Sequence, residues 1–242
     1  MPADRSPTSH ASQESDPGVP ATQMMRPLEV ARLLAQAVDA HGDYFPGHSD
    51  GVAYILRLMA SDADLPEPQV RKLQVAAELH DIGKLRIPAA ILSAPRRLSD
   101  EEFELMRRHP GYGAEIAEAM GYSSEEGFDR WPIADVAPWI RHHHERVDGK
   151  GYPNGLSGDE IPLESRMIFV ADAFHVMTSN RPYQRSRTRT EAMEELVRCA
   201  GTQFCPRVVA MIAHRNSRAD VDEVLEHLRA VARKLPAGNR PD

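Results

Sequence analysis

The sequence contains little that would place the protein outside a reducing compartment. Among its 242 residues are only two cysteines, Cys199 and Cys205, which are too few for a disulfide scaffold and do not form a C-x-x-C pair. No apolar run approaches the roughly 18–20 residues that a membrane helix needs. The N-terminus also lacks the hydrophobic region of a signal peptide. We therefore predict a cytoplasmic protein that has no membrane partner.

Positive charge is scarce as well. The chain has 29 Lys and Arg against 36 Asp and Glu, so its formal net charge is −7. Proteins that grip a nucleic-acid backbone without regard to sequence need a basic surface. We therefore predict no DNA partner, and any anionic ligand must be met by a local group of side chains.

Several well-known catalytic motifs are missing. The segment that follows His144 lacks the second histidine of H-E-x-x-H, which excludes a zincin, and no C-x-x-C is present for a zinc finger. There is neither a G-x-S-x-G nor a Walker-type glycine loop. Any metal chemistry must therefore come from another arrangement of ligands.

Strand patterns are also missing, because no segment alternates apolar and polar residues over the length of a strand, whereas helical spacing recurs from Leu28 onward. We predict an all-α fold with a disordered tail at 1–26, one domain at 27–236 and a flexible C-terminus at 237–242. A Ser99–Glu102 capping box opens one helix, and Pro110 is expected to keep His109 out of α geometry. The expected helices cover 28–41, 49–60, 68 to a cap at Gly83, 99–108, 111–120, 133–145, 163–179, 190–200, 206–216 and 220–234.

Histidine is in excess, with five of the eleven residues lying within one 65-residue stretch. His142, His143 and His144 take successive positions of a predicted helix and turn by about 100° each, so they cannot all face solvent on a helix with an apolar face. Two neighbouring imidazoles can bind one metal ion. The alternative is a polar helix end in which one histidine is buried and hydrogen-bonded.

Two carboxylates also indicate a metal or a buried partner. Asp172 lies in the apolar segment MIFVADAF, where an unpaired carboxylate would cost several kcal/mol. His80 and Asp81 follow an apolar run in AAELHDIGK, and a carboxylate can bridge two divalent ions. An isolated His-Asp pair is more often a surface pair or a charge at a helix end, however. Taken alone, His48 indicates a capping or surface histidine, and His109 indicates a structural histidine.

Five segments of the chain carry a resemblance to a known family. In order they read HDIGK, RRHPGYGAEI, HHHERVDGKGYPNGLSGDEIP, VADAFHVMTSNRPYQ and AGTQFCPRVV. Together they closely resemble the HD-GYP family of cyclic dinucleotide phosphodiesterases over about residues 45–215. The resemblance implies an HD-superfamily helical bundle, within the domain at 27–236, whose Gly/Pro-rich GYP loop covers a metal centre. It also implies hydrolysis of cyclic di-GMP to pGpG and/or GMP.

The same resemblance implies two divalent metal ions, with iron or manganese expected. Asp81 would bridge the two ions and would be one of the catalytic residues. The seven implied ligands are His48, His80, Asp81 and Asp172 for one ion, and Asp81, His109, His143 and His144 for the other.

Other roles follow from the same motifs. Lys84 of HDIGK would be catalytic and would touch the phosphate or the attacking oxygen. Tyr152 of the GYP loop and Arg181 of NRPY would bind the substrate. His142 and Glu145 would orient the ligands without binding metal themselves.

Four positions depart from the family pattern. Trinuclear members carry a glutamate where this chain has Tyr44, so a third metal is not expected. Gln184 replaces a basic residue after RPY, Ala94 lies where the family has a lysine, and Cys205 stands in FCP in place of FDP. These changes could weaken dinucleotide binding while leaving the metal ligands complete.

Two other functions remain open at this stage. One is a phosphohydrolase for another cyclic dinucleotide or nucleotide, because Gln184 and the altered loop would reshape the pocket. The other is a nucleotide-sensing module with weak or no catalysis, which would bind a diguanylate cyclase through the GYP loop. A regulatory partner and a homodimer are further possibilities.

Overall fold

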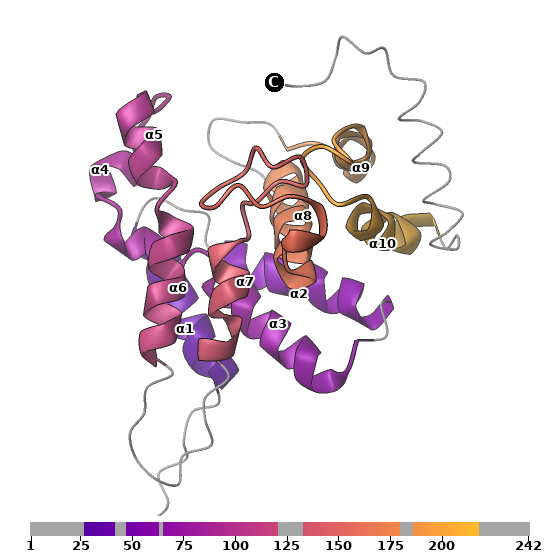
Figure 1. Ribbon diagram of the computed structural model, residues 1–242, viewed down its shortest axis with the longest axis horizontal. Coiled ribbons are helices and arrows are strands. Elements are labelled where there is room, and N and C mark those ends of the chain that lie inside the picture. Colours follow the sequence, from indigo (N-terminus) through magenta and orange to yellow (C-terminus); the bar gives the residue numbers. More distant parts are fainter. Residues whose placement is uncertain (1–26, 42–46, 63–64, 121–132, 180–185, 218–242) are drawn as a thin grey trace, which may run out of the picture.

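A computed structural model describes residues 27–41, 47–62, 65–120, 133–179 and 186–217 of the chain. Within these ranges the structure is a helical bundle without a named strand (Figure 1), which confirms the predicted all-α fold. Two isolated β-bridges, between Asp148 and Ser157 and between Ala200 and Phe204, occur in loops. In the described part, no helix is both long enough and apolar enough to span a membrane.

Three helices near the start of the bundle pack on one another. They are α1 (Pro27–His41), α2 (His48–Asp62) and α3 (Glu67–Leu79), of which α3 contacts both others. Leu56 and Met59 of α2 and Leu73 and Leu79 of α3 are almost completely buried. Such burial stabilises each large side chain by about 1.5–3 kcal/mol, so this apolar core fixes where the ends of α2 and α3 lie.

A short 3₁₀-helix, η1 (Ile82–Arg86), connects this group to the next helices. It packs against α6 (His109–Met120), after α4 (Ala89–Leu92) and α5 (Asp100–Met106) have extended away from the core (Figure 1). The Ser99–Glu102 capping box that begins α5 is present as predicted, with both reciprocal hydrogen bonds.

The second half of the bundle is arranged around α8 (Leu163–Thr178), which packs against α2. Before it come η2 (Ala134–Val136), α7 (Ala137–Arg141) and a long loop that contains η3 (Gly158–Glu160). After it, α9 (Arg189–Arg198) and α10 (Pro206–Ser217) pack on α8. Figure 1 shows the loop crossing above α7 and α8.

Three details of the predicted helices are wrong. The helix expected at 133–145 stops at Arg141, and His142–His144 form a turn, because the chain leaves the helix axis to enter the loop. Gly83 is not a helix cap but lies in η1, since α3 ends at Leu79. The α6 helix includes His109, with Pro110 in its first turn, where a missing N–H costs nothing. The helix predicted at 220–234 lies outside the described residues.

Candidate metal centre

Seven side chains from five separate places in the sequence converge at one place in the bundle. His48 begins α2, His80 and Asp81 follow α3, and His109 begins α6. The others are His143 and His144 on the turn after α7, and Asp172 within α8. Five of the seven are buried, while His144 and Asp172 are partly buried. Two groups have potential ligand atoms within 4.8 Å of one another, namely His48, His80 and Asp81, and His109, His143 and His144.

The carboxylate of Asp81 lies between these two groups. Its Oδ1 is 3.3 Å from Nε2 of His109, which belongs to one group. Its Oδ2 is 3.4 Å from Nε2 of His80 and 3.9 Å from Nε2 of His48, which belong to the other. One carboxylate therefore presents a different oxygen to each group, as an aspartate that bridges two cations must.

Backbone carbonyls orient three of the histidine rings. Nδ1 of His80 lies 2.6 Å from the carbonyl oxygen of Ala77, and Nδ1 of His143 lies 2.6 Å from that of Ile140. Nδ1 of His109 makes the same contact with the carbonyl oxygen of the residue three positions earlier, at 2.8 Å. A ring whose Nδ1–H donates to a carbonyl keeps its lone pair on Nε2, which is the tautomer that binds a metal.

The Nε2 atoms of these buried rings point toward the interior of the site. Nε2 of His109 is 3.4 Å from Nε2 of His143, although neither atom carries the proton when both Nδ1 atoms donate. Nε2 of His80 is buried and has no hydrogen-bond partner among the described residues. A buried ring nitrogen left in this way is costly whether or not it carries a proton. The residues present therefore fit one or more divalent ions with nitrogen and oxygen ligands.

The ionisation of the site agrees with this interpretation. Burial lowers the pKa of His109 and His143 and lowers that of His144 to about 3, so these rings are neutral, as metal ligands must be. Burial also opposes protonation of His80, but Asp81 beside it raises the pKa of this ring to about 9. Metal binding at His80 would therefore release a proton.

The two aspartates are ionised although they are surrounded by protein. Burial alone would raise the pKa of Asp81, but Lys84 and His80 outweigh it and hold this pKa well below its usual range. Nζ of Lys84 lies 2.5 Å from Oδ2 of Asp81, and both side chains are buried. Burial of Asp172 is likewise outweighed by His48, whose Nε2 is 3.2 Å from Oδ1, so its pKa is also lowered. Both carboxylates can therefore bind cations at neutral pH.

One residue of the site was missed by the sequence analysis. Nδ1 of His175 lies 3.1 Å from Nδ1 of His48, and Ser179 contacts the His175 ring in turn. His175 lies three residues after Asp172 on α8, so the two side chains share a face of that helix. This spacing was the signal that could have identified His175 as a residue that orients His48.

The Gly/Pro-rich loop is anchored next to the histidines by Glu145. The Glu145 side chain is buried and accepts hydrogen bonds from the backbone N–H of Asn154 at 2.7 Å and of Leu156 at 3.1 Å. The loop also approaches closely at Gly151, where a Cβ atom would lie 2.3 Å from the backbone nitrogen of Arg146. Glu145 thus holds the loop, and its expected role in orienting ligands stays a prediction.

Tyr152 of this loop lies at the edge of the centre. Its ring centroid is 4.9 Å from that of His144, and the guanidinium of Arg107 lies 5.1 Å from the centroid of the same tyrosine ring. The peptide bond between Tyr152 and Pro153 is cis. Tyr152 therefore lies against the histidine cluster, and its contact with a bound substrate stays a prediction.

Replacing Glu145 with glutamine is expected to loosen the loop. The amide keeps the shape of the side chain but places an N–H₂ group opposite a backbone N–H, which leaves a buried donor unpaired at a cost of about 1–3 kcal/mol. Trypsin cleavage after the exposed Lys150 should become several times faster. Glu160→Gln is the control, because Glu160 also accepts from a loop N–H but is exposed. Equal cleavage rates in the two variants would contradict the anchoring role.

Several positions singled out from the sequence lie outside the described residues. They are Arg181, which was expected to bind substrate, and the departures Tyr44 and Gln184. The fourth departure, Cys205, is buried with its sulfur 3.7 Å from a guanidinium nitrogen of Arg166. Ala94 lies just after α4, and nothing in the structure explains it.

Comparisons with known proteins identify the family. The HD domain model matches residues 32–208. The chain is 35% identical over 199 residues to the cyclic di-GMP phosphodiesterase response regulator RpfG of Xanthomonas campestris, covering 82% of this chain and 50% of that protein. It is 35% identical over 166 residues to 3′3′-cGAMP-specific phosphodiesterase 1 of Vibrio cholerae, covering 69% and 36% of the two chains.

A solved structure shares the fold. The cyclic GMP-AMP-specific phosphodiesterase V-cGAP3 of Vibrio cholerae superimposes with a TM-score of 0.60 at 20% identity, over 87% of this chain and 54% of that one. The chain thus spans about half or less of the length of the relatives it matches. Since the family model covers well over half of the sequence, the chain belongs to the HD domain family and carries a domain of the HD-GYP type.

Proposed function

We propose that this domain is a metal-dependent phosphodiesterase that hydrolyses cyclic di-GMP to pGpG and/or GMP. The observation that carries the proposal is the carboxylate of Asp81, which has one oxygen near each of two histidine clusters. The relation to a cyclic di-GMP phosphodiesterase over 82% of this chain supports the choice of substrate. A phosphodiester bond in a cyclic dinucleotide is the linkage that such a centre is suited to cleave.

HD-domain phosphohydrolases depend on metal ions, and we propose that two divalent ions bind here, with no third. Iron or manganese suits a set of imidazole and carboxylate ligands. Bound divalent ions supply Lewis acidity toward phosphoryl oxygens and lower the pKa of water toward neutrality. One ion would be held by His48, His80, Asp81 and Asp172, and the other by Asp81, His109, His143 and His144.

The chain's own residues would bind and orient the phosphate. Lys84 carries a buried positive charge next to Asp81. From there it would stabilise the negative charge that grows on the phosphoryl oxygens during cleavage. Tyr152 would contact the ligand from the loop, and Arg181 would bind a phosphate. His175 would keep the His48 ring in its ligating orientation.

A second candidate substrate is another cyclic dinucleotide, 3′3′-cGAMP. It is favoured by the relation to a 3′3′-cGAMP-specific phosphodiesterase over 69% of this chain. The two substrates differ only in one base, so the metal centre and Lys84 would act on both in the same way. A regulatory partner, a homodimer and the cytoplasmic location stay predictions.

A substrate panel tests the proposal. The protein is purified without oxygen, loaded with Fe(II) or Mn(II) and incubated with cyclic di-GMP, 3′3′-cGAMP and cyclic di-AMP, and the products are separated by chromatography. We expect cyclic di-GMP to be consumed at least about tenfold faster than the other two, and chelator-treated protein to be inactive. If 3′3′-cGAMP were consumed faster than cyclic di-GMP, 3′3′-cGAMP would be the preferred substrate. Absence of turnover by metal-loaded protein would overturn the proposed function.

A further inference from the structure

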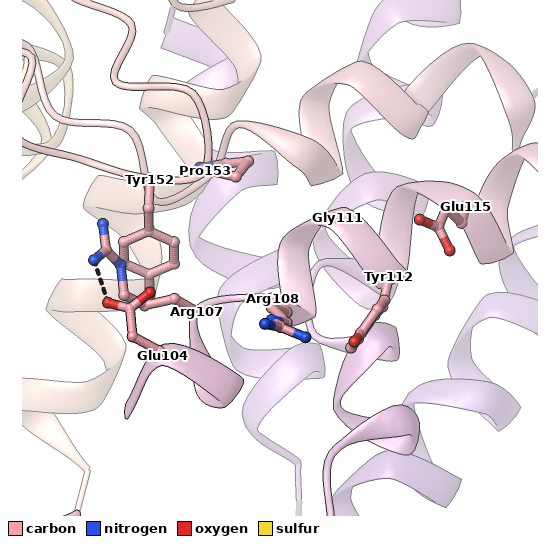
Figure 2. Close-up of a pocket in the computed structure, with 8 residues that line it drawn as sticks. All are labelled: Glu104, Arg107, Arg108, Gly111, Tyr112, Glu115, Tyr152 and Pro153. Atoms are coloured by element: carbon pink, nitrogen blue, oxygen red, sulfur yellow. Dashed lines mark hydrogen bonds and ion pairs between the residues drawn. The ribbon is translucent and has the colours of Figure 1, made fainter. Parts of the chain in front are cut away.

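A groove lies directly beside the metal-binding cluster. It has a volume of about 340 Å³ and is lined by residues from the end of α5, the first turns of α6 and the tip of the loop. These residues include Arg107, Arg108, Gly111, Tyr112, Tyr152 and Pro153 (Figure 2). The volume is at the low end of the range for small-molecule sites, about 300–1,000 Å³, so the groove suits part of a ligand such as a cyclic dinucleotide.

Two residues join this groove to the cluster. Tyr152 lines the groove, and its ring also lies against His144, with 4.9 Å between the ring centroids. Arg108 immediately precedes His109, another of the clustered histidines. A molecule that has one end at the cluster can therefore extend into the groove by passing Tyr152.

The charges of the groove are balanced except at one arginine. Glu104 accepts a hydrogen bond from Arg107 at 2.7 Å, which Figure 2 shows, and Glu115 is paired with Arg86. Arg108 is exposed, and its guanidinium forms no ion pair or side-chain hydrogen bond with the residues that the structure describes. The groove thus offers one uncompensated positive charge toward an anion.

We propose that this groove is a subsite for the half of the cyclic dinucleotide that is not being cleaved, with Arg108 binding its phosphate. This inference rests on the proposed function and extends it to a residue outside the metal cluster. A cyclic dinucleotide has two phosphates on opposite sides of one ring. When one phosphate is at the cluster, the other must lie at a distance from it and needs its own cation. A guanidinium binds a phosphate through two parallel N–H donors, which suits this task.

The test compares Arg108→Gln with Arg71→Gln in the metal-loaded protein. Arg71 is an exposed arginine of α3, far from the groove in sequence and not part of its lining, so its replacement removes the same charge elsewhere. KM and kcat are measured for cyclic di-GMP and for bis(p-nitrophenyl) phosphate, a phosphodiester without a second nucleotide. Equilibrium binding of the linear dinucleotide pGpG is measured in parallel.

We expect Arg108→Gln to raise the ratio of the two KM values, cyclic di-GMP over bis(p-nitrophenyl) phosphate, about tenfold and to weaken pGpG binding similarly. The dependence of the cyclic di-GMP KM on salt should also become weaker, because an exposed charge has been removed. Arg71→Gln should match the wild type in every measurement. If Arg108 only stabilised the fold, its replacement would change the KM values of both substrates by the same factor.

Two outcomes would overturn the subsite. One is an Arg108→Gln variant that equals Arg71→Gln for cyclic di-GMP and pGpG, and the other is an equal loss for both phosphodiesters. Failure of the proposed function is distinguished by the wild type, which would then cleave bis(p-nitrophenyl) phosphate but not cyclic di-GMP. In that case only the binding of pGpG still tests the subsite. If Arg108→Gln bound pGpG as tightly as the wild type, the subsite would be rejected.

Discussion

Replacing Asp81 with asparagine is expected to reduce kcat for cyclic di-GMP by roughly 10³-fold or more and to lower the metal content of the purified protein. The reason is that one carboxylate faces both histidine groups, with its two oxygens 3.3 Å and 3.4 Å from Nε2 of His109 and His80. An amide has no charge and only one acceptor atom, so it cannot bridge two cations. Metal analysis and steady-state kinetics on the same preparation measure both effects.

The substitution also changes the stability of the folded protein. Lys84 would lose the carboxylate that lies 2.5 Å from its ammonium group in a buried position, which costs about 3 kcal/mol in typical cases. The control is Asp135→Asn, since Asp135 forms an exposed pair with Lys72 at 2.8 Å that is worth at most about 1 kcal/mol. If Asp81→Asn had the same metal content and turnover as Asp135→Asn, the assignment of Asp81 as a bridging ligand would be wrong.

Replacing Gly83 with alanine is expected to destabilise the protein by about 3 kcal/mol or more. A Cβ atom at Gly83 would lie 1.9 Å from the carbonyl oxygen of His109 and 2.5 Å from the backbone nitrogen of Gly113. Both atoms belong to the backbone of α6, which cannot move aside as a flexible side chain can, so η1 and α6 would have to separate. At this chain length we expect a drop in Tm of roughly 6–12 °C.

The matched control is Gly111→Ala, a glycine in the first turn of α6. The nearest atom to a Cβ there is a guanidinium nitrogen of Arg141 at 3.8 Å, which is ordinary contact. Alanine should therefore fit and should stabilise the helix by up to about 1 kcal/mol. Thermal unfolding followed by circular dichroism in the presence of a chelator separates the packing effect from metal binding. Equal Tm values for both variants would show that η1 and α6 are not held in close contact.

Asp81 and Gly83 lie two residues apart in one short segment. Asp81 presents its carboxylate to both histidine groups, and two residues later Gly83 lets η1 lie directly on α6, the helix that begins with His109. The close approach therefore brings His109 within reach of Asp81. We expect Gly83→Ala to lower metal content as well as stability.

The sequence by itself determined the helices and the types of residue in the site. Most of the observed helices were predicted from three local signals: helical periodicity, the Ser99–Glu102 capping box and the prolines near helix starts. These signals suffice because each acts within a few residues of the chain. The order of motifs also indicated the family and the seven candidate ligands. Such local patterns could not show that the helix before His143 ends at Arg141 and continues as a turn.

Only the tertiary structure decided how these residues meet. His48 and Asp172 are 124 positions apart, yet Nε2 of one lies 3.2 Å from Oδ1 of the other because α2 packs on α8. The roles of Glu145 and His175 and the groove beside Arg108 likewise depend on contacts between distant segments. Distances across a bundle follow from the packing of whole helix faces, which no short stretch of sequence specifies.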